Sequence, residues 1–256
     1  MSKEPQPVFI IGAQRSGTTF LREWLKSFPG VLGTLQATPE PRVLRQLSFG
    51  NSADWRDEAF GSSWRNGKFS HLLEKSTSHL GDRTLAAVTQ KHCPSAAIIV
   101  SLRDPIERAV SNYRLSVKSG YEDLPILEAF ERDAERSPRK SPPGLSVNPF
   151  KYLRRGLYAD QLAPWIENIP VSNLHITTFE SLVTGEAGLG EVANFLGLAQ
   201  SQSPPQTLGP TNTSSSPEIE AEHVTELAQR FGPFFHQSND QLVRFGIDIH
   251  AWQHFN

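Results

Sequence analysis

The stretch that most constrains this chain is Val8–Thr19, which reads VFIIGAQRSGTT. A short apolar run breaks at Gly12, and after Gly17 the apolar residues recur at helical spacing. This order predicts a strand, a glycine loop and the N-terminus of a helix. In that arrangement the backbone N–H groups and the helix dipole surround one anion. The sequence therefore predicts a phosphate-binding loop.

The loop departs from the nucleotide triphosphatase pattern at one position. The spacing of Gly12 and Gly17 matches GxxxxGK[ST], but Thr18 stands where that pattern has its lysine, and Arg15 lies inside the loop. A triphosphatase uses the lysine on its β- and γ-phosphates. A loop that keeps the glycines and moves the cation favours a different phosphate-bearing donor. A P-loop kinase or nucleotidase stays open as an alternative.

Length and composition fit a single domain spanning residues 1–256. The chain has 256 residues, of which 38% are hydrophobic, and this is enough to bury a core. We expect a disordered N-terminus at 1–6 and loop-rich segments at 118–149 and 201–217. The net charge of −2 excludes a general polyanion binder, so no nucleic-acid partner is expected.

The first residues and the cysteine count bear on the cellular location of the protein. The single cysteine, Cys93, excludes an internal disulfide, which suits a reducing compartment. The start, MSKEPQPVFI, lacks the charged and apolar regions of a signal peptide, and no apolar run approaches the ~20 residues of a membrane span. We expect a cytoplasmic protein without a transmembrane segment.

Apolar runs and helical periodicity alternate along the chain. Strands are expected at 8–11, 31–35, 71–74, 96–102 and 174–178. Helices are expected at 17–28, 82–92, 105–117, 126–134, 156–167 (with a kink or boundary at Pro164), 189–196, 218–231 and 239–245, and the segment 44–69 reads as irregular. The alternation predicts an α/β fold with a central parallel sheet flanked by helices.

A second motif follows the most apolar predicted strand. Arg103 comes directly after that strand, Asp104 and Pro105 carry N-cap and first-turn signals for a helix, and Ser111 lies two turns later. Ligands of open α/β sheets bind at the carboxyl ends of the strands. An arginine fork with a hydroxyl suits a second phosphate. The plainer alternative is a local Arg103–Asp104 salt bridge with a surface serine.

Together these motifs resemble the sulfotransferases that use 3'-phosphoadenosine 5'-phosphosulfate (PAPS), most nearly the heparan sulfate and carbohydrate type. GAQRSGTTFLREWL resembles the family's 5'-phosphosulfate loop, and SLRDPIERAVSNY resembles its 3'-phosphate motif. LEKSTSHL, RGLYADQLAPWIENIP and LHITTFESL are similar to further family segments, and the likeness runs from about Pro7 to Trp252. It implies the P-loop-like sulfotransferase fold.

The resemblance implies a role for each matching residue. PAPS is the donor substrate and adenosine 3',5'-bisphosphate (PAP) the product, and no metal is required. The 5'-phosphosulfate would be held by the loop residues, and the 3'-phosphate by the second motif. The loop residues are Gln14, Arg15, Ser16, Gly17, Thr18 and Thr19, and the second motif supplies Arg103 and Ser111.

Three residues are implied in catalysis. Glu40 matches the family glutamate and would be the general base, although Thr38, Pro39 and Arg42 replace its usual neighbours. Lys75 would assist the leaving oxygen, and Arg15 would neutralise charge on the transferring group. Glu74 would hold Lys75 or Arg15.

Several points stay open. The resemblance favours a hydroxyl acceptor on a carbohydrate or glycoconjugate but does not identify the molecule. The sequence does not indicate the oligomeric state. A non-catalytic PAP(S)-binding protein remains an alternative. The family's basic late loop is missing, because 201–216 contains no lysine or arginine. We therefore expect backbone or hydroxyl groups, such as those of Asn212 and Thr213, to close over the 3'-phosphate.

Overall fold

The computed structural model describes residues 4–35, 40–50, 54–136, 148–184, 186–199 and 221–255. The chain forms two compact units, each described here by itself: unit 1 is Met1–Leu102 with Gln161–Thr211, and unit 2 is Arg103–Asp160 with Asn212–Asn256. The single-domain expectation stays a prediction. The segment 201–217 and its residues Asn212 and Thr213 lie outside the described residues.

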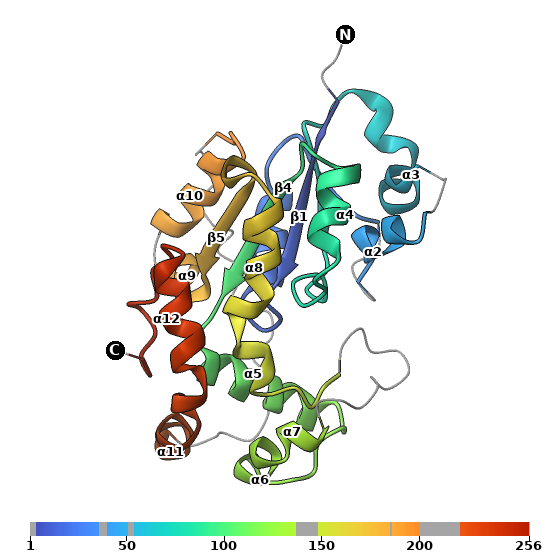
Figure 1. Cartoon of the computed structure of the whole chain (residues 1–256). Coiled ribbons are helices and arrows are strands. Elements are labelled where there is room, and N and C mark those ends of the chain that lie inside the picture. Colours follow the sequence, from blue (N-terminus) through green and yellow to red (C-terminus); the bar gives the residue numbers. More distant parts are fainter. Residues whose placement is uncertain are drawn as a thin grey trace. The chain divides into compact units, whose positions relative to one another are not determined.

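Unit 1 is built on a five-stranded sheet in the order β2-β3-β1-β4-β5, with every pairing parallel (Figure 1). The strands are β1 (Gln6–Gly12), β2 (Val31–Gly33), β3 (His71–Lys75), β4 (Ala97–Leu102) and β5 (Leu174–Thr178). All five predicted strand segments are confirmed. Because the strands are parallel, their carboxyl ends share one edge, and the loops that follow them meet there.

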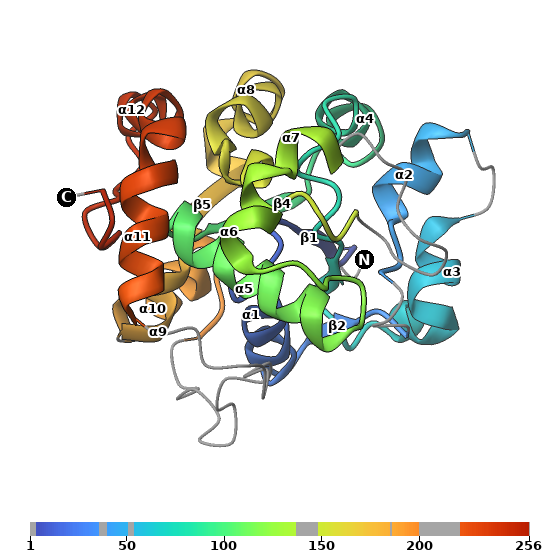
Figure 2. The same cartoon turned by 90° about the horizontal axis from the view of Figure 1, so that it is seen from below.

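Helices cover both faces of the sheet (Figures 1 and 2). One face carries α1 (Thr18–Lys26), α9 (Phe179–Thr184) and α10 (Glu186–Phe195), and the other carries α4 (Leu85–His92) and α8 (Tyr158–Asn168), whose first three residues belong to unit 2. Side chains from β1 such as Val8 and Ile10 pack against Leu21 of α1 and Val192 of α10 in one buried cluster. The predicted α/β architecture is thus confirmed.

The segment predicted as irregular, 44–69, instead holds short helices. They are α2 (Val43–Ser48), α3 (Trp55–Phe60) and the 3-10 helix η1 (Gly61–Asn66). Asp54 caps α3 by accepting a hydrogen bond from the Arg56 N–H at 3.1 Å, and Phe60 is fully buried. Helices this short are marginal alone, so burial of one face, rather than a long periodic pattern, stabilises them.

Unit 2 is helical. It contains α5 (Pro105–Lys118), α6 (Ile126–Glu131), α7 (Asp133–Arg136), η2 (Arg154–Gly156), α11 (Ala221–Phe231), η4 (Gly232–Phe235) and α12 (His236–Arg244). Asp104 caps α5 through Ile106 N–H at 2.9 Å, as its sequence predicts. The single helix expected at 126–134 is two short helices. The hydrophobic core of unit 2 lies between α5, α6 and α11 and includes residues such as Ile106, Phe130 and Leu227.

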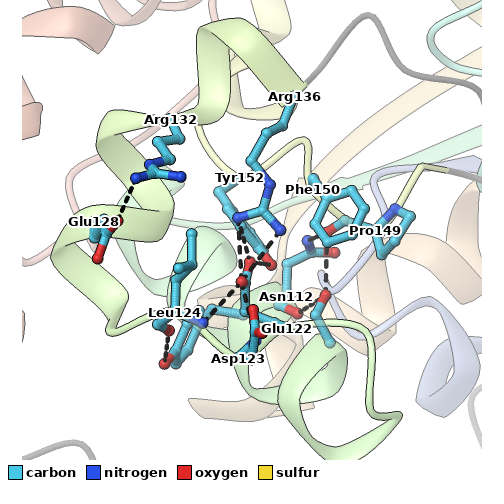
Figure 3. A network of polar contacts seen from close by, with 12 residues as sticks. Asn112, Glu122, Asp123, Leu124, Glu128, Arg132, Arg136, Pro149, Phe150 and Tyr152 are labelled. Atoms are coloured by element: carbon cyan, nitrogen blue, oxygen red, sulfur yellow. Dashed lines mark hydrogen bonds and ion pairs between the residues drawn. The ribbon is translucent and has the colours of Figure 1, made fainter.

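A buried polar network lies in unit 2 (Figure 3). Glu122 accepts hydrogen bonds from both Arg136 guanidinium Nη atoms at 3.1 and 3.2 Å, from Tyr152 Oη at 2.6 Å and from the Leu124 N–H at 3.2 Å. Arg136 also lies over the Phe150 ring, 4.0 Å from its centre. Every charge in this pair is thereby compensated, as burial requires.

Candidate active site

The glycine loop leaves β1 and is fixed from the neighbouring strand. The Ala13 N–H donates to the Ser101 carbonyl at 2.6 Å, and Ser101 Oγ donates to the Ser16 carbonyl at 2.6 Å. Arg15 and Gly17 both have left-handed backbones, with φ of 71° and 73°. Alternation of this kind turns successive N–H groups toward one point and creates an anion-binding concavity. Ser101 was not predicted as part of the site.

Gly17 is required for two separate reasons. Its positive φ is costly for residues with a side chain, and a Cβ built on it would lie 2.6 Å from Cδ2 of Phe179. Phe179 is the first residue of α9, which directly follows β5. A distant part of unit 1 therefore supports the loop.

The loop presents groups suited to a phosphate. Ser16 is fully buried, and its Oγ has no hydrogen-bond partner among the described residues. Helix α1 begins at Thr18 without a side-chain cap and without an acidic residue in its first turn. A helix start of this type favours an anion. Gln14 and Thr19 flank these groups, so the predicted loop residues do come together.

The end of β3 lies beside the end of β1. Lys75 is in register with Ile10, and the Ser76 N–H donates to the Ile10 carbonyl at 3.0 Å. Lys75 therefore emerges at the sheet edge from which the glycine loop leaves. The structure thus brings the predicted Lys75 to the predicted loop's side of unit 1.

Glu40 meets the same strand end. Its Oε1 lies 3.5 Å from Lys75 Nζ and accepts hydrogen bonds from Thr77 N at 2.9 Å and Thr77 Oγ1 at 2.7 Å. Burial raises the pKa of Glu40, but Lys75 and Thr77 together outweigh burial and leave that pKa below its ordinary value. Glu40 is therefore an ionised carboxylate at neutral pH. Thr77 was not predicted, although it follows the EKS segment directly.

Beneath this pair lies a second carboxyl group, Glu74, which is fully buried. Its Oε1 accepts a hydrogen bond from Ser76 Oγ, and its Oε2 lies 3.9 Å from Nδ1 of His79, which is 1% exposed. Burial raises the pKa of Glu74 to about 8 and lowers the pKa of His79 to about 4. Both side chains are thus uncharged at neutral pH.

Glu74 was expected to hold Lys75 or Arg15, but Lys75 pairs with Glu40, and Glu74 accepts from Ser76 instead. The reason is the strand's alternation, which turns successive side chains to opposite faces of the sheet. Thr38 and Pro39 lie outside the described residues. Arg42 has a left-handed backbone, with φ of 55°, and its N–H donates to Ser76 Oγ at 2.9 Å.

In unit 2 the second motif is held at the start of α5. Arg103 Nη2 lies 3.2 Å from Glu107 Oε2, and its carbonyl accepts from Tyr158 Oη at 2.8 Å. Asp104 is committed to the helix cap and to the His254 N–H, so an Arg103–Asp104 salt bridge is not the motif's role. Ser111 is half-buried in the second turn of α5.

Within the described residues, no three histidine, cysteine, aspartate or glutamate side chains gather in a way that could hold a metal ion. Among the same residues, every helix is too short or too polar to cross a membrane.

Comparison with known proteins gives consistent matches. The sulfotransferase family model matches residues 7–137. Heparan sulfate glucosamine 3-O-sulfotransferase 3B1 of Homo sapiens is 27% identical, over 91% of this chain and 62% of the relative. The bifunctional heparan sulfate N-deacetylase/N-sulfotransferase 3 of Homo sapiens is 29% identical, over 74% of this chain and 22% of the relative.

A solved structure shares the whole fold. The sulfotransferase from Alicyclobacillus acidocaldarius superposes with a TM-score of 0.76 at 20% identity, covering 98% of this chain and 99% of that one. The chain spans only about 60% of the length of the first curated relatives, with 62% and 60% covered.

Proposed function

This chain belongs to the sulfotransferase family, and from that premise we propose that it transfers the sulfuryl group of PAPS to a hydroxyl of a carbohydrate or glycoconjugate. The acceptor oxygen attacks sulfur, the bond from sulfur to the bridging phosphate oxygen breaks, and PAP leaves with that electron pair. The acceptor proton passes to Glu40. The products are a sulfate ester and PAP.

The glycine loop fits the donor's 5' end. The buried, unpartnered Ser16 Oγ and the uncapped start of α1 offer donors to an anion, and the left-handed Arg15 and Gly17 shape the backbone around it. Gln14, Thr18 and Thr19 belong to the same proposed site. The Arg15 guanidinium would offset charge on the transferring group and the leaving phosphate.

Glu40 and Lys75 divide the chemistry between a base and an electrophile. Paired with Lys75, Glu40 has a lowered pKa and is a weak base. When Lys75 turns to the leaving oxygen, Glu40 loses its counter-charge and its pKa rises, which strengthens it as a base. Thr77 keeps the carboxylate in place during this exchange, since its two hydrogen bonds do not depend on Lys75.

Unit 2 would bind the 3'-phosphate through Arg103 and Ser111. Arg103→Ala should weaken PAP binding, because the phosphate loses a charge-assisted fork. Binding of adenosine 5'-phosphosulfate, which lacks the 3'-phosphate, should change little. Equal losses for both ligands would contradict this assignment.

The observation that carries the proposal is the 3.5 Å pairing of Glu40 with Lys75 at the sheet edge where the glycine loop begins. The test is incubation with PAPS and a panel of acceptors, scored by mass spectrometry for a sulfuryl increment. PAP should also raise the melting temperature, and ATP with Mg²⁺ should raise it much less. A rise in melting temperature with ATP and Mg²⁺ but not with PAP would favour a nucleotide kinase instead. The cytoplasmic location belongs to the proposal and is tested by cell fractionation.

A further inference from the structure

The segment from Ser76 to Leu80, which follows β3, is fixed to β1 at both of its ends. The Ser76 N–H donates to the Ile10 carbonyl at 3.0 Å, and the Leu80 N–H donates to the Ile11 carbonyl at 2.9 Å. A turn between these attachments is closed by the His79 N–H, which donates to the Ser76 carbonyl at 3.1 Å. The segment therefore belongs to the framework of the sheet, and rigid elements of this kind hold reacting groups more precisely than free loops do.

Two neighbouring residues of this segment contact the part of the chain that carries the proposed base. Thr77 donates twice to Glu40 Oε1, from its N–H at 2.9 Å and from Oγ1 at 2.7 Å. Ser76 Oγ accepts a hydrogen bond from the Arg42 N–H at 2.9 Å. Thr77 thus holds the carboxylate itself, and Ser76 holds the backbone two residues further along the chain.

The Ser76 hydroxyl is itself fixed by Glu74. Ser76 is fully buried, and its Oγ donates to Glu74 Oε1 while it accepts from the Arg42 N–H, so its proton and a lone pair are both used. Burial raises the pKa of Glu74 to about 8, so Glu74 adds no negative charge beside Glu40 at neutral pH. The hydroxyl therefore links the buried end of β3 to the backbone that follows Glu40.

The distances around Glu40 separate the role of Thr77 from that of Lys75. Lys75 Nζ lies 3.5 Å from Glu40 Oε1, beyond the usual length of a charge-assisted hydrogen bond, whereas both Thr77 contacts have ordinary hydrogen-bond lengths. The Thr77 hydroxyl is attached directly to Cβ, and the Lys75 ammonium ends a long flexible stem. Lys75 therefore supplies charge to Glu40, and Thr77 fixes its position.

From these contacts we propose that Ser76 and Thr77 are positioning residues for the general base. Thr77 aligns the Glu40 carboxylate, and Ser76 holds the backbone between Glu40 and Arg42 against the end of β3. Both act through Glu40 rather than on the donor or the acceptor. The inference rests on the proposed sulfuryl transfer with Glu40 as its base, and it adds the groups that orient this base.

The first experiment compares the turnover of two Thr77 variants. Thr77→Val keeps the shape of the side chain and the backbone N–H but removes the hydroxyl. Its kcat should fall about tenfold, with PAP affinity and the KM for the acceptor near those of the parent, because a misaligned base slows only the chemical step. Thr77→Ser restores the hydroxyl and should recover most of the lost kcat. A parent-like kcat in Thr77→Val, or a Thr77→Ser variant that is equally slow, would overturn the role of Thr77.

Thr84→Val is the matched control, because Thr84 makes the same two contacts with a carboxylate that has no part in the proposed reaction. The Thr84 N–H and Oγ1 donate to Asp82 Oδ1 at 3.2 and 2.7 Å, and Thr84 is exposed. Loss of this hydroxyl should leave kcat and PAP affinity unchanged. An equal fall of kcat in Thr84→Val and Thr77→Val would show that the effect does not pass through Glu40.

The second experiment follows the titration of Glu40 in the substrate-free protein by carbon-13 NMR, with its carboxyl signal assigned through Glu40→Gln. Burial raises the pKa of Glu40, and Lys75 and the Thr77 hydroxyl lower it. Thr77→Val should therefore move the titration midpoint to higher pH, and Thr77→Ser should not. The titratable neighbours Lys75, Glu74 and His79 are the same in both variants, so a difference in midpoint reports the hydroxyl. An unchanged midpoint in Thr77→Val would overturn the proposed contact.

Ser76→Ala tests the second contact. It removes the acceptor of the Arg42 N–H but leaves both Thr77 bonds, so kcat should fall several-fold while PAP affinity and the Glu40 midpoint stay at their parent values. Ser76→Cys fills the same space with a weaker acceptor and should show the same pattern, so the test does not depend on one buried substitution. A parent-like kcat in both variants, or a midpoint that moves as in Thr77→Val, would overturn the separate role of Ser76.

The two proposals fail separately. Absence of PAP binding and of any sulfated product contradicts sulfuryl transfer, but the NMR titrations then still decide whether Thr77 holds the Glu40 carboxylate. Sulfation of an acceptor by the parent, together with a parent-like kcat and midpoint in Thr77→Val, supports the activity and rejects the positioning role.

Discussion

Two buried glutamates in this chain have opposite surroundings. In unit 2, Glu122 receives an arginine, a tyrosine hydroxyl and backbone N–H groups (Figure 3). In unit 1, Glu74 receives a serine hydroxyl and faces an uncharged histidine, and burial raises its pKa to about 8. The first is a charge fully compensated by its partners, and the second is a carboxyl group kept neutral by burial.

The difference between the two glutamates distinguishes a structural role from a role in a reaction. A compensated network such as that of Glu122 stabilises one arrangement of helices and leaves nothing to react. Around Glu74 the cation that could pair with it, Lys75, is used by Glu40 instead. An incompletely compensated cluster beside an ionised carboxylate is typical of a functional site. Each of the following changes should affect one region and leave the other intact.

The largest effect is expected from Glu40→Gln. The amide keeps the shape of the side chain but cannot accept the acceptor's proton, so turnover should fall by ~10² to 10⁴, the usual contribution of a general base. Steady-state kinetics with saturating acceptor measures this, while PAP affinity and melting temperature should stay near those of the parent. Turnover within a few fold of the parent would remove Glu40 from the mechanism.

Arg136→Met should instead affect stability. It strands the Glu122 carboxylate, whose side chain is 0% exposed, and should lower the free energy of unfolding by ~3–5 kcal/mol in urea denaturation. Arg132→Met is the matched control, because Arg132 pairs with Glu128 at the surface, with 52% of its side chain exposed, and should cost ~1 kcal/mol or less. Equal losses in the two variants would show that Glu122 is not specially dependent on its arginine.

The smallest expected effect is a change in pH dependence for Glu74→Gln. The pKa of Glu74 is raised in the native state, so the native protein holds a proton that the unfolded chain releases, and this contribution to stability is lost as pH rises toward about 8. His79, with its pKa lowered to about 4, acts only below about pH 6.5. Between about pH 6.5 and about pH 8, the free energy of unfolding of the parent should fall relative to that of Glu74→Gln, on the order of 1 kcal/mol per pH unit. Urea denaturation at a series of pH values measures this. Parallel stability curves would mean that Glu74 is ionised in the native state.

The sheet was predictable because its strands are short apolar runs bounded by glycine, proline or polar residues. Ala97–Leu102, for example, is buried at every position and carries no charge. Helix α2 and helix α3 were not predicted, because their stability comes from residues such as Leu44 and Phe60 that are buried by the fold rather than from periodicity. Helix α8 continues through Pro164, and the neighbouring Leu162 and Trp165 are fully buried, so packing of this segment outweighs the cost of the proline.

The residues of the candidate site could be named from the sequence one by one, but their contacts could not. The sequence resemblance indicated Glu40 and Lys75 separately, and nothing local brings residues so far apart in the chain to 3.5 Å. Thr77 and Ser76 were missed because serine and threonine occur in most loops, and only the fold shows that these two bind Glu40 and the Arg42 backbone. The hydrogen bond from Ser76 to Glu74 was also missed, since spacing along a strand does not say which neighbour a carboxyl group meets.

The contact between Phe179 and Gly17 has a consequence for anyone who trims this chain. The family match ends at residue 137, yet the aromatic ring that packs against Gly17 of the glycine loop comes from the first residue of α9. A fragment cut at the end of the match would also lack β5 and the leucines of α9 and α10 that complete the core. A fragment limited to the family match would therefore lack residues that support the glycine loop and the core.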